Sequence, residues 1–178
     1  MGKRSDFVRV ERDYYPTPWK VAQPLLAHLN PRTLFGEPCA GDGRLMRHLE
    51  EAGHFCVDAF DLEPQHESVD SGDALTDSFD YVSAGYTGGV ICITNPPWRR
   101  DFLHPFITHW RAQMPTWVLC DADWAHTVQA KPFLPYCQKI VAVGRVKWIE
   151  GSKHTGKDNC AWYLFGANEA PTIFYGRI

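Results

Sequence analysis

The sequence predicts an α/β protein whose sheet is largely parallel and is covered by helices. Three observations lead to this fold class. Strand-like apolar runs alternate with helix-like amphipathic runs along the 178 residues. A glycine turn, Gly41-Asp42-Gly43, separates a strand-like run from an amphipathic run. Residues 90–93 form a continuous apolar run, which is typical of a strand buried on both faces.

The first expected element is a helix that starts at Thr17-Pro18. Threonine is a good N-cap, and proline suits the first helical turn because its fixed φ is already helical. The apolar residues that then share one face of this helix are Val21, Leu25, Leu26 and Leu29. Pro24 should kink it, because proline lacks the donor that the helix needs there.

The remaining elements follow in the same way. An amphipathic helix runs through Leu45 and Leu49 and ends at Gly53, and a second helix is expected over 102–114, with Pro105 in its first turn. Residues 68–86 are polar and receive no assignment. Strands are expected at 33–37, 55–60, 90–93, 117–120, 140–149 and 161–165, of which the last two should pair as an antiparallel hairpin.

Composition excludes several classes of protein. Lys and Arg total 18 against 21 Asp and Glu, a net charge of −3, which excludes a globally basic nucleic-acid binder but not a local basic patch. No apolar run reaches 18 residues, and residues 1–6 lack an apolar signal segment, so no membrane span or secretion is expected. The six cysteines form no C-x-x-C pair, so we expect no metal site and a reducing compartment, the cytoplasm.

The glycine turn is a candidate ligand site. Two glycines let the backbone pass close to a ligand, and the helix that follows presents N–H groups to it. A plain strand-to-helix turn explains G-x-G equally well on its own. The dinucleotide fingerprint G-x-G-x-x-G fails, because Met46 occupies the third glycine position, and a nicotinamide cofactor is therefore disfavoured.

Two acidic residues lie where a nucleoside would need acceptors. Asp61 ends the next predicted strand, the position from which doubly wound folds bind ribose hydroxyls, and Glu63 competes for this role. A turn-forming aspartate is the structural alternative. Asp73 is a candidate acceptor for an adenine amino group, although an acid in a loop is usually just solvated.

The segment Asn95-Pro96-Pro97-Trp98 carries the strongest chemical signal. The prolines make a rigid loop at the carboxyl end of a buried strand, which is the ligand edge of an open α/β sheet. The Asn95 side chain and the Pro96 carbonyl offer two acceptors for the N–H bonds of an exocyclic amine, and Trp98 can stack on its ring. The alternative is a proline loop terminator with a core tryptophan.

These motifs, in this order, resemble those of S-adenosylmethionine-dependent DNA adenine N6-methyltransferases of the small phage or prophage type. That family has an acidic residue, proline and G-x-G, matched here over 37–43. Its catalytic motif is Asp, Asn or Ser, then Pro-Pro and an aromatic residue, matched over 95–98. The Thr17-Pro18 helix start resembles the segment that closes over the methionine carboxylate. The segments 121–124 and 144–148 also look like phage-family sequence, without an assigned role.

The resemblance implies a Rossmann-like class I methyltransferase fold, with a seven-stranded mixed sheet, helices on both faces and an antiparallel strand from the last hairpin. It implies S-adenosylmethionine as cofactor, direct methyl transfer to adenine in DNA, and Asn95, Pro96, Pro97 and Trp98 as the catalytic loop. The implied cofactor-binding residues are Tyr15, Thr17, Pro18, Glu37, Pro38, Cys39, Ala40, Gly41, Gly43, Asp61, Leu62, Asp73, Ala74 and Asn95.

Basic residues outside these motifs are candidate phosphate contacts. The segment 151–157 matches most of a P-loop, but Asp158 replaces the magnesium-binding hydroxyl and a strand follows, so a mobile basic loop is the better interpretation. A solvated hairpin turn is the alternative. With Trp98, the candidate substrate-binding residues are Arg99, Arg145, Lys147, Lys153 and Lys157.

We expect one methyltransferase domain over 1–178 without a separate target-recognition domain, hence short or relaxed site specificity, in the cytoplasm of a bacterial or phage-infected cell. The same loop chemistry also serves adenine in RNA, cytosine N4 and protein glutamine. A methyltransferase-like module that binds nucleic acid without turnover is the alternative of another class. The oligomeric state is left open.

Overall fold

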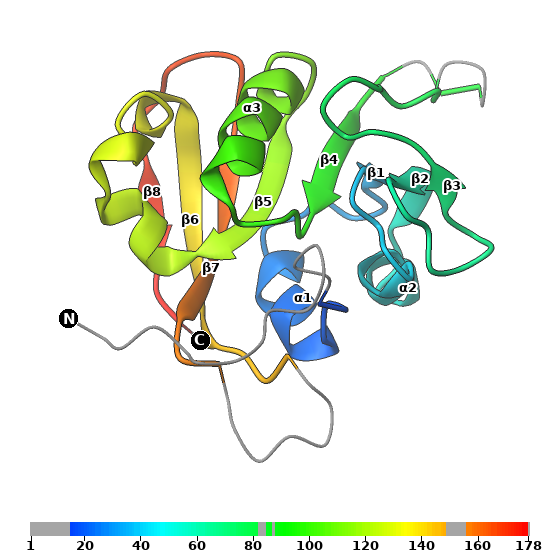
Figure 1. The fold of residues 1–178 in the computed structure, drawn as a ribbon, viewed down its shortest axis with the longest axis horizontal. Coiled ribbons are helices and arrows are strands. Elements are labelled where there is room, and N and C mark those ends of the chain that lie inside the picture. Colours follow the sequence, from blue (N-terminus) through cyan, green and yellow to red (C-terminus); the bar gives the residue numbers. More distant parts are fainter. Residues whose placement is uncertain (1–14, 82–84, 87, 149–155, 178) are drawn as a thin grey trace.

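Eight strands form one mixed sheet in the computed structural model, which describes residues 15–81, 85–86, 88–148 and 156–177 (Figure 1). The strand order is β3-β2-β1-β4-β5-β7-β6-β8. The strands from β3 to β5 pair in parallel, β7 is antiparallel to both neighbours, and β8 is parallel to β6. Their bounds are β1 Leu34–Glu37, β2 Phe55–Asp61, β3 Asp70–Ser71, β4 Val90–Thr94, β5 Thr116–Asp121, β6 Cys137–Arg145, β7 Asn159–Phe165 and β8 Ile173–Tyr175.

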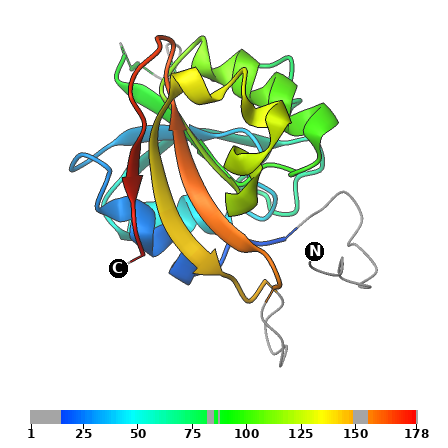
Figure 2. The same ribbon diagram turned by 90° about the vertical axis from the view of Figure 1, so that its left-hand side faces the viewer.

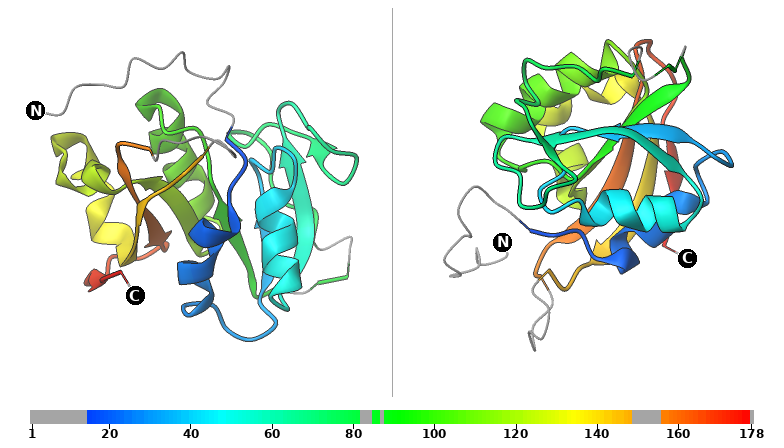
Figure 3. Two further views of the ribbon diagram at one scale, coloured as in Figure 1. Left: turned by 90° about the horizontal axis from the view of Figure 1, so that it is seen from below. Right: turned by 90° about the vertical axis from the view of Figure 1, so that its right-hand side faces the viewer.

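Helices cover both faces of the sheet, as the right-hand view of Figure 3 shows. Helices α1 (Trp19–Leu26) and α2 (Arg44–Glu51) bury Val21, Leu25, Leu45 and Leu49 in one apolar cluster with Trp162 of β7. Helix α3 (Arg100–Arg111) and the 3₁₀ turns that follow β5 pack into a second cluster on the other face. Two cores on opposite faces explain why the central strands are buried throughout.

The predicted fold class and all six predicted strands are confirmed. The runs predicted at 140–149 and 161–165 form the antiparallel hairpin, as β6 and β7, and Figure 2 shows the two strands side by side. Strand β6 begins earlier than expected, at Cys137, and ends at Arg145, whereas residue 149 lies outside the described residues. The hairpin follows the pairing expected from its apolar runs, and β7 inserts between β5 and β6 in the sheet. The antiparallel strand therefore comes from the last hairpin, as the resemblance implied.

The part of the chain that the structure describes has eight strands in the sheet, where seven were expected. Strand β3 has only two residues and lies within the polar segment that gave no periodic signal. Strand β8 extends the sheet beyond β6, and both Ile173 and Phe174 are more than half exposed there. Strands this short carry too few residues for a pattern of period two to identify them.

Two helix starts also differ from expectation. Helix α1 begins at Trp19 after Pro18, and no side chain among the described residues caps it, so Thr17 is not the N-cap. Helix α3 begins at Arg100, two residues before the expected start, which places Pro105 in its second turn and not in its first. Both proline-containing helices keep their buried faces, because packing outweighs the loss of one backbone hydrogen bond.

The parallel strands place the predicted motifs at one edge of the sheet. Strands β1, β2 and β4 are parallel, so the turns after Glu37, Asp61 and Thr94 all emerge at their carboxyl ends. Strand β7 starts at this same edge, because Cys160 pairs with Asp121 at the end of β5. No helix among the described residues is long and apolar enough to cross a membrane.

Candidate functional site

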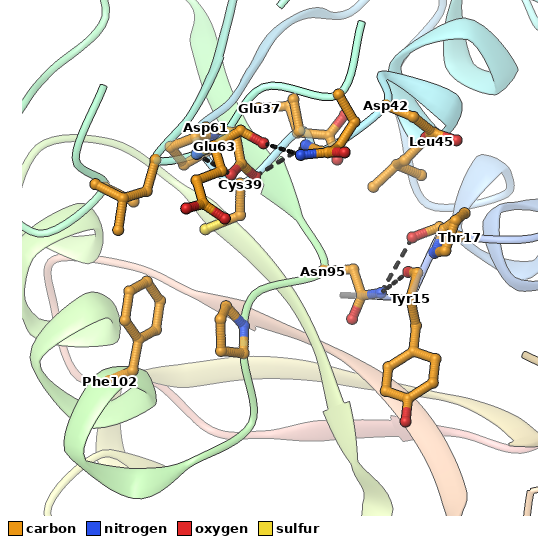
Figure 4. A pocket seen from close by; sticks show the side chains of 18 of the residues that line it. Tyr15, Thr17, Glu37, Cys39, Asp42, Leu45, Asp61, Glu63, Asn95 and Phe102 are labelled. Carbon is orange, nitrogen blue, oxygen red and sulfur yellow. Dashed lines mark hydrogen bonds between the residues drawn. The ribbon is translucent and has the colours of Figure 1, made fainter. Parts of the chain in front are cut away.

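A cavity of about 680 Å³ opens at the carboxyl edge of β1, β2 and β4. Figure 4 shows its walls, with the glycine turn and the end of β2 on one side and Asn95 with Tyr15 on the other. The lining residues are Tyr15, Pro16, Thr17, Glu37, Pro38, Cys39, Ala40, Gly41, Asp42, Leu45, Asp61, Leu62, Glu63, Gln65, Asp73, Ala74, Asn95, Pro97, Arg99 and Phe102.

The glycine turn needs its glycines. Gly41 and Gly43 have φ angles of 55° and 72°, in the left-handed region that favours glycine. Arg47 of α2 stabilises the turn, because its guanidinium donates to the Asp42 carbonyl at 2.8 Å. The Asp42 carboxylate in turn accepts the Arg44 N–H at 2.9 Å, at the start of α2. The backbone of this turn therefore forms a fixed wall of the cavity.

Asp61 connects two walls of the cavity. Its Oδ2 accepts the Gly41 N–H at 2.9 Å, and its Oδ1 accepts the Glu63 N–H at 2.9 Å. The loop after β2 is bound to the same turn a second time, because the Gln65 N–H donates to the Gly41 carbonyl at 2.9 Å. Each carboxylate oxygen keeps a further lone pair, so Asp61 can still accept from a ligand hydroxyl.

Glu37 is a buried carboxyl group at the end of β1 with an unused acceptor. Its side chain is 2% exposed, and Oε2 has no hydrogen-bond partner among the described residues. Burial raises the pKa of Glu37 well above its usual value, and the nearby Asp42 and Asp61 carboxylates raise it further. The Met46 N–H acts in the opposite direction by stabilising the charged form. A buried orphan acceptor at a cavity wall is suited to a ligand that brings a donor or a positive charge.

The charge of the cavity is negative. Among the described lining residues, Glu37, Asp42, Asp61, Glu63 and Asp73 are acidic, whereas Arg99 is the one basic residue. Five carboxyl groups against one guanidinium repel pyrophosphate and attract cations. This balance disfavours a nucleotide cofactor with phosphates. No group of three or more metal-ligating side chains occurs among the described residues.

Cys39 lines the cavity without the properties of a nucleophile. Burial raises the pKa of its thiol well above the usual value, and the Asp61 and Glu37 carboxylates raise the pKa further. The thiol is therefore neutral near pH 7, whereas the thiolate is the reactive form of cysteine. A covalent mechanism through Cys39 is disfavoured on this ground.

Asn95 follows β4 and has its side-chain amide bonded on both sides. Its Nδ2 donates to Thr17 Oγ1 at 3.1 Å and to the Tyr15 carbonyl at 3.5 Å. Its Oδ1 accepts the Trp98 indole N–H at 3.2 Å. These contacts join the catalytic loop predicted from the sequence to the segment before α1, about 80 residues away in the chain.

The structure brings most of the predicted cofactor residues together. Twelve of the fourteen line the cavity, and the exceptions are Pro18 and Gly43. Of the predicted catalytic loop, Asn95 and Pro97 line it, whereas Pro96 and Trp98 do not. The cavity also has lining residues that the motifs do not predict, namely Pro16, Asp42, Leu45, Gln65 and Phe102, and Glu63 is predicted only as a competitor of Asp61. Their adjacency to recognised motifs was the available signal for Pro16, Asp42, Leu45 and Phe102.

The predicted phosphate contacts divide into two groups. Arg99 lies at the cavity, exposed, with its Nε 3.4 Å from Asp101. Arg145, Lys147 and Lys157 are exposed near the β6–β7 turn and do not line the cavity. Lys153 lies outside the described residues. The base of this turn is closed by a 2.7 Å hydrogen bond from the Gly156 N–H to the Val146 carbonyl.

Known proteins match the chain in structure and not in sequence. No protein-family model matches the sequence, and no curated protein matches it. A type I restriction-modification methyltransferase subunit from Streptococcus thermophilus superposes with a TM-score of 0.58 at 11% identity, covering 91% of this chain and 47% of its own length. The M protein of the EcoKI restriction enzyme gives 0.54 at 12% identity, covering 90% and 47%.

A proposed RNA methyltransferase from Pyrococcus horikoshii gives a TM-score of 0.59 at 16% identity, covering 93% of this chain and 91% of its own. The chain thus spans about half the length of the type I subunits and nearly all of this third protein. Together these structures show that the chain has the class I fold of S-adenosylmethionine-dependent methyltransferases.

Proposed function

We propose that this chain transfers a methyl group from S-adenosylmethionine to the exocyclic N6 amine of adenine in DNA. The observation that carries the proposal is the position of Asn95. Its amide lies at the carboxyl end of β4 on the wall of an acidic cavity, and Pro97 of the same rigid loop lines that cavity with it. This arrangement supports the proposal, because a hydrogen-bond acceptor for an amine then lies beside a cavity whose carboxyl groups attract positive charge.

The residues of the cavity fit the cofactor. S-adenosylmethionine carries a sulfonium, an ammonium and a carboxylate group, so its net charge is positive, and it has no phosphate. This charge suits a cavity with five carboxyl groups and the unpartnered Glu37 oxygen. Glu37 would accept from the ammonium group, Asp61 from the ribose hydroxyls, and Asp73 from the adenine amine. When bound, the cofactor supplies an electrophilic methyl group on sulfur.

The loop after β4 would prepare the acceptor amine. An exocyclic amine is a weak nucleophile, because its lone pair is delocalised into the ring. Asn95 Oδ1 and the Pro96 carbonyl would accept its two N–H bonds, which favours a pyramidal nitrogen with its lone pair directed at the methyl group. In the proposed transfer the bond from nitrogen to the methyl carbon would form as the carbon–sulfur bond breaks, S-adenosylhomocysteine would leave, and the proton displaced from the amine would pass to solvent. Catalysis then consists of positioning and electrostatics, without a covalent enzyme intermediate.

The choice of DNA rests on the motif resemblance. The target adenine must leave the duplex to reach a methyl group inside the cavity, so base flipping is expected. We also propose that the chain acts as one methyltransferase domain with short or relaxed site specificity. Sequencing treated DNA tests this point, and a strict site of six or more base pairs would contradict it.

The proposed reaction is tested with labelled S-adenosylmethionine and DNA, RNA and protein in parallel. We expect label in DNA, recovered as N6-methyladenine by mass spectrometry of nucleosides. The Asn95→Ala variant should lose on the order of 10²–10³ in rate, as for removal of one preorganised polar partner, and still bind the cofactor. Label in RNA, cytosine or glutamine without N6-methyladenine in DNA would contradict the proposal that adenine in DNA is the substrate.

A methyltransferase-like module without turnover is the rival of another class. Calorimetry with S-adenosylmethionine addresses it directly, because an inactive scaffold has no need to bind the cofactor. We expect binding that weakens when Asp61 is replaced. An absence of binding, together with an absence of methyl transfer, would favour the rival.

A further inference from the structure

We propose that Trp98 and Thr17 are positioning residues that fix which end of the Asn95 amide faces the substrate, and that Trp148 supports Trp98 in this task. The inference rests on the proposed function for the meaning of Asn95, but its geometry stands on its own. The sequence assigns Trp98 a different role, stacking on the target base. The structure instead gives its indole N–H a partner within the catalytic loop.

The partners of Asn95 identify the two ends of its amide. The Trp98 indole N–H can only donate, so the atom 3.2 Å from it must be the oxygen. The Tyr15 carbonyl can only accept, so the atom 3.5 Å from it must be the nitrogen. Thr17 Oγ1, at 3.1 Å from the nitrogen, supplies a second acceptor on that side. A flipped amide would oppose N–H to N–H and oxygen to oxygen.

This orientation is the one that the proposed reaction needs. The oxygen has two lone pairs, and Trp98 occupies one of them, which leaves the other for the target amine. A flipped amide would present an NH₂ group to the substrate NH₂ and repel it. Trp98 and Thr17 bind opposite ends of the Asn95 amide. They therefore keep Oδ1 available to the target amine and Nδ2 bonded to the protein.

Trp148 holds the Trp98 ring in place from a third part of the chain. The Trp98 and Trp148 rings meet edge to face, with centroids 5.8 Å apart and an interplanar angle of 78°. Trp148 also contacts the Tyr15 ring, at 6.1 Å between centroids. At the base of the β6–β7 turn, a Cβ added to Gly156 would lie 3.4 Å from the Trp148 indole. The segments before α1, after β4 and after β6 thus meet around Asn95.

The test separates the indole N–H from the indole ring. Trp98→Phe keeps an aromatic ring and removes the donor, and Thr17→Val keeps the shape and removes the acceptor. Thr17→Ser restores the hydroxyl group. Trp19→Phe is the matched control, because Trp19 is an exposed tryptophan that packs on His48 and does not line the cavity.

The first readout is NMR of the protein without substrate, which needs no methyl transfer. The Trp98 indole N–H resonance is assigned by its loss in Trp98→Phe. We expect it to shift and exchange faster with solvent in Asn95→Ala, and to stay unchanged in Trp19→Phe. The Asn95 NH₂ resonances should shift in Thr17→Val and return towards their original position in Thr17→Ser. If the Trp98 indole N–H resonance has the same shift and exchange rate in Asn95→Ala as in the wild type, the inference is overturned.

The second readout is kinetic. We expect kcat to fall on the order of 10-fold in Trp98→Phe and in Thr17→Val, with little change in the KM for DNA, because a misplaced acceptor costs rate more than binding. The double variant should lose less than the product of the two single losses, since both act on one amide. Unchanged kcat with a raised KM for DNA would instead assign Trp98 to base stacking. If Asn95→Ala keeps full turnover, the proposed function fails. The NMR result would still show whether Trp98 and Thr17 hydrogen-bond to the Asn95 amide.

Discussion

The Asp61 carboxylate binds the glycine turn to the end of β2, because its Oδ2 accepts the Gly41 N–H at 2.9 Å. Its second oxygen accepts the Glu63 N–H at the same distance, so one side chain fixes two backbone segments of the cavity. The residue expected to bind ribose hydroxyls also shapes the wall against which the ribose would lie. Asp61 would therefore both bind the ribose and hold the backbone of the cavity wall in place.

Replacing this carboxylate should weaken cofactor binding more than it weakens the fold. In Asp61→Asn the amide can accept from only one of the two N–H groups, and its NH₂ faces the other. A lost charge-assisted hydrogen bond costs about 1.5–3 kcal/mol, so we expect affinity for S-adenosylmethionine to fall roughly 10- to 100-fold. Isothermal titration calorimetry measures this change.

The matched control for this variant is Asp58→Asn on the same strand. Asp58 also accepts a backbone N–H, that of Asp80, at 2.9 Å, but it does not line the cavity. We expect a similar loss of thermal stability in the two variants and weaker cofactor binding only in Asp61→Asn. Equal affinities in the two variants would rule out a ligand role for Asp61.

Glu37 should make the stability of the protein depend on pH. Burial raises its pKa in the folded state above the ordinary value of about 4.3, so the folded protein holds a proton that the unfolded chain releases. Its contribution to stability is therefore complete below the ordinary pKa and is lost as the pH rises through the raised one. Denaturant unfolding at several pH values should show this fall in the wild type.

The Glu37→Gln variant tests whether Glu37 causes this dependence of stability on pH. Glutamine has nearly the same shape and no ionisable proton, so the unfolding free energy should vary less with pH and exceed that of the wild type at the higher values. Cofactor binding should weaken, because the amide cannot release a proton to become the carboxylate that would pair with an ammonium group. A pH dependence identical to that of the wild type would place the effect at another carboxyl group.

The chemistry-bearing segments of the site could be predicted from the sequence because each is local. The segments 37–43 and 95–98 are short runs whose glycines and prolines set the backbone directly, and both lie at the predicted edge. The position of Asp61 follows from the helix and the strand that come after the glycine turn, because Asp61 ends that strand. Local motifs on parallel strands meet at one edge without further information.

The contacts around Asn95 could not be predicted in this way. Its partner Thr17 lies 78 residues away in the chain, and no periodic pattern reports such a contact. Thr17 carries a typical N-cap signal, but its hydroxyl is used by Asn95 and the helix starts without it. Likewise Trp148, which follows β6, contacts Trp98, which follows β4, although β4 and β6 are not neighbours in the sheet. Sequence pattern leaves such a contact undetermined.

Gly36 of β1 should tolerate no side chain, because the Phe79 ring occupies the space. A Cβ built there would lie 2.5 Å from two Phe79 ring atoms, and Phe79 is itself buried. We expect Gly36→Ala to destabilise the protein by about 1–3 kcal/mol, the usual cost of overpacking. Thermal or denaturant unfolding measures the loss, with Gly176→Ala as the control at a position where nothing lies within 4 Å. Adding Phe79→Leu to Gly36→Ala should recover part of the stability, and no recovery would mean that the Phe79 ring does not cause the loss.

Arg99 should contribute to nucleic-acid binding through phosphate contact and not through base recognition. It is the one basic residue among the described lining residues, and its side chain is 62% exposed beside the cavity. In Arg99→Gln we expect affinity for DNA to fall by roughly 3- to 10-fold on all sequences, and the slope of log K against log salt to decrease in magnitude by about one. Fluorescence anisotropy over a salt series measures both quantities.

Arg32→Gln is the control, because Arg32 precedes β1 at the opposite edge of the sheet and stacks on Phe55. A loss confined to one DNA sequence would mean that Arg99 contacts a base, and an unchanged salt slope would remove it from the DNA surface.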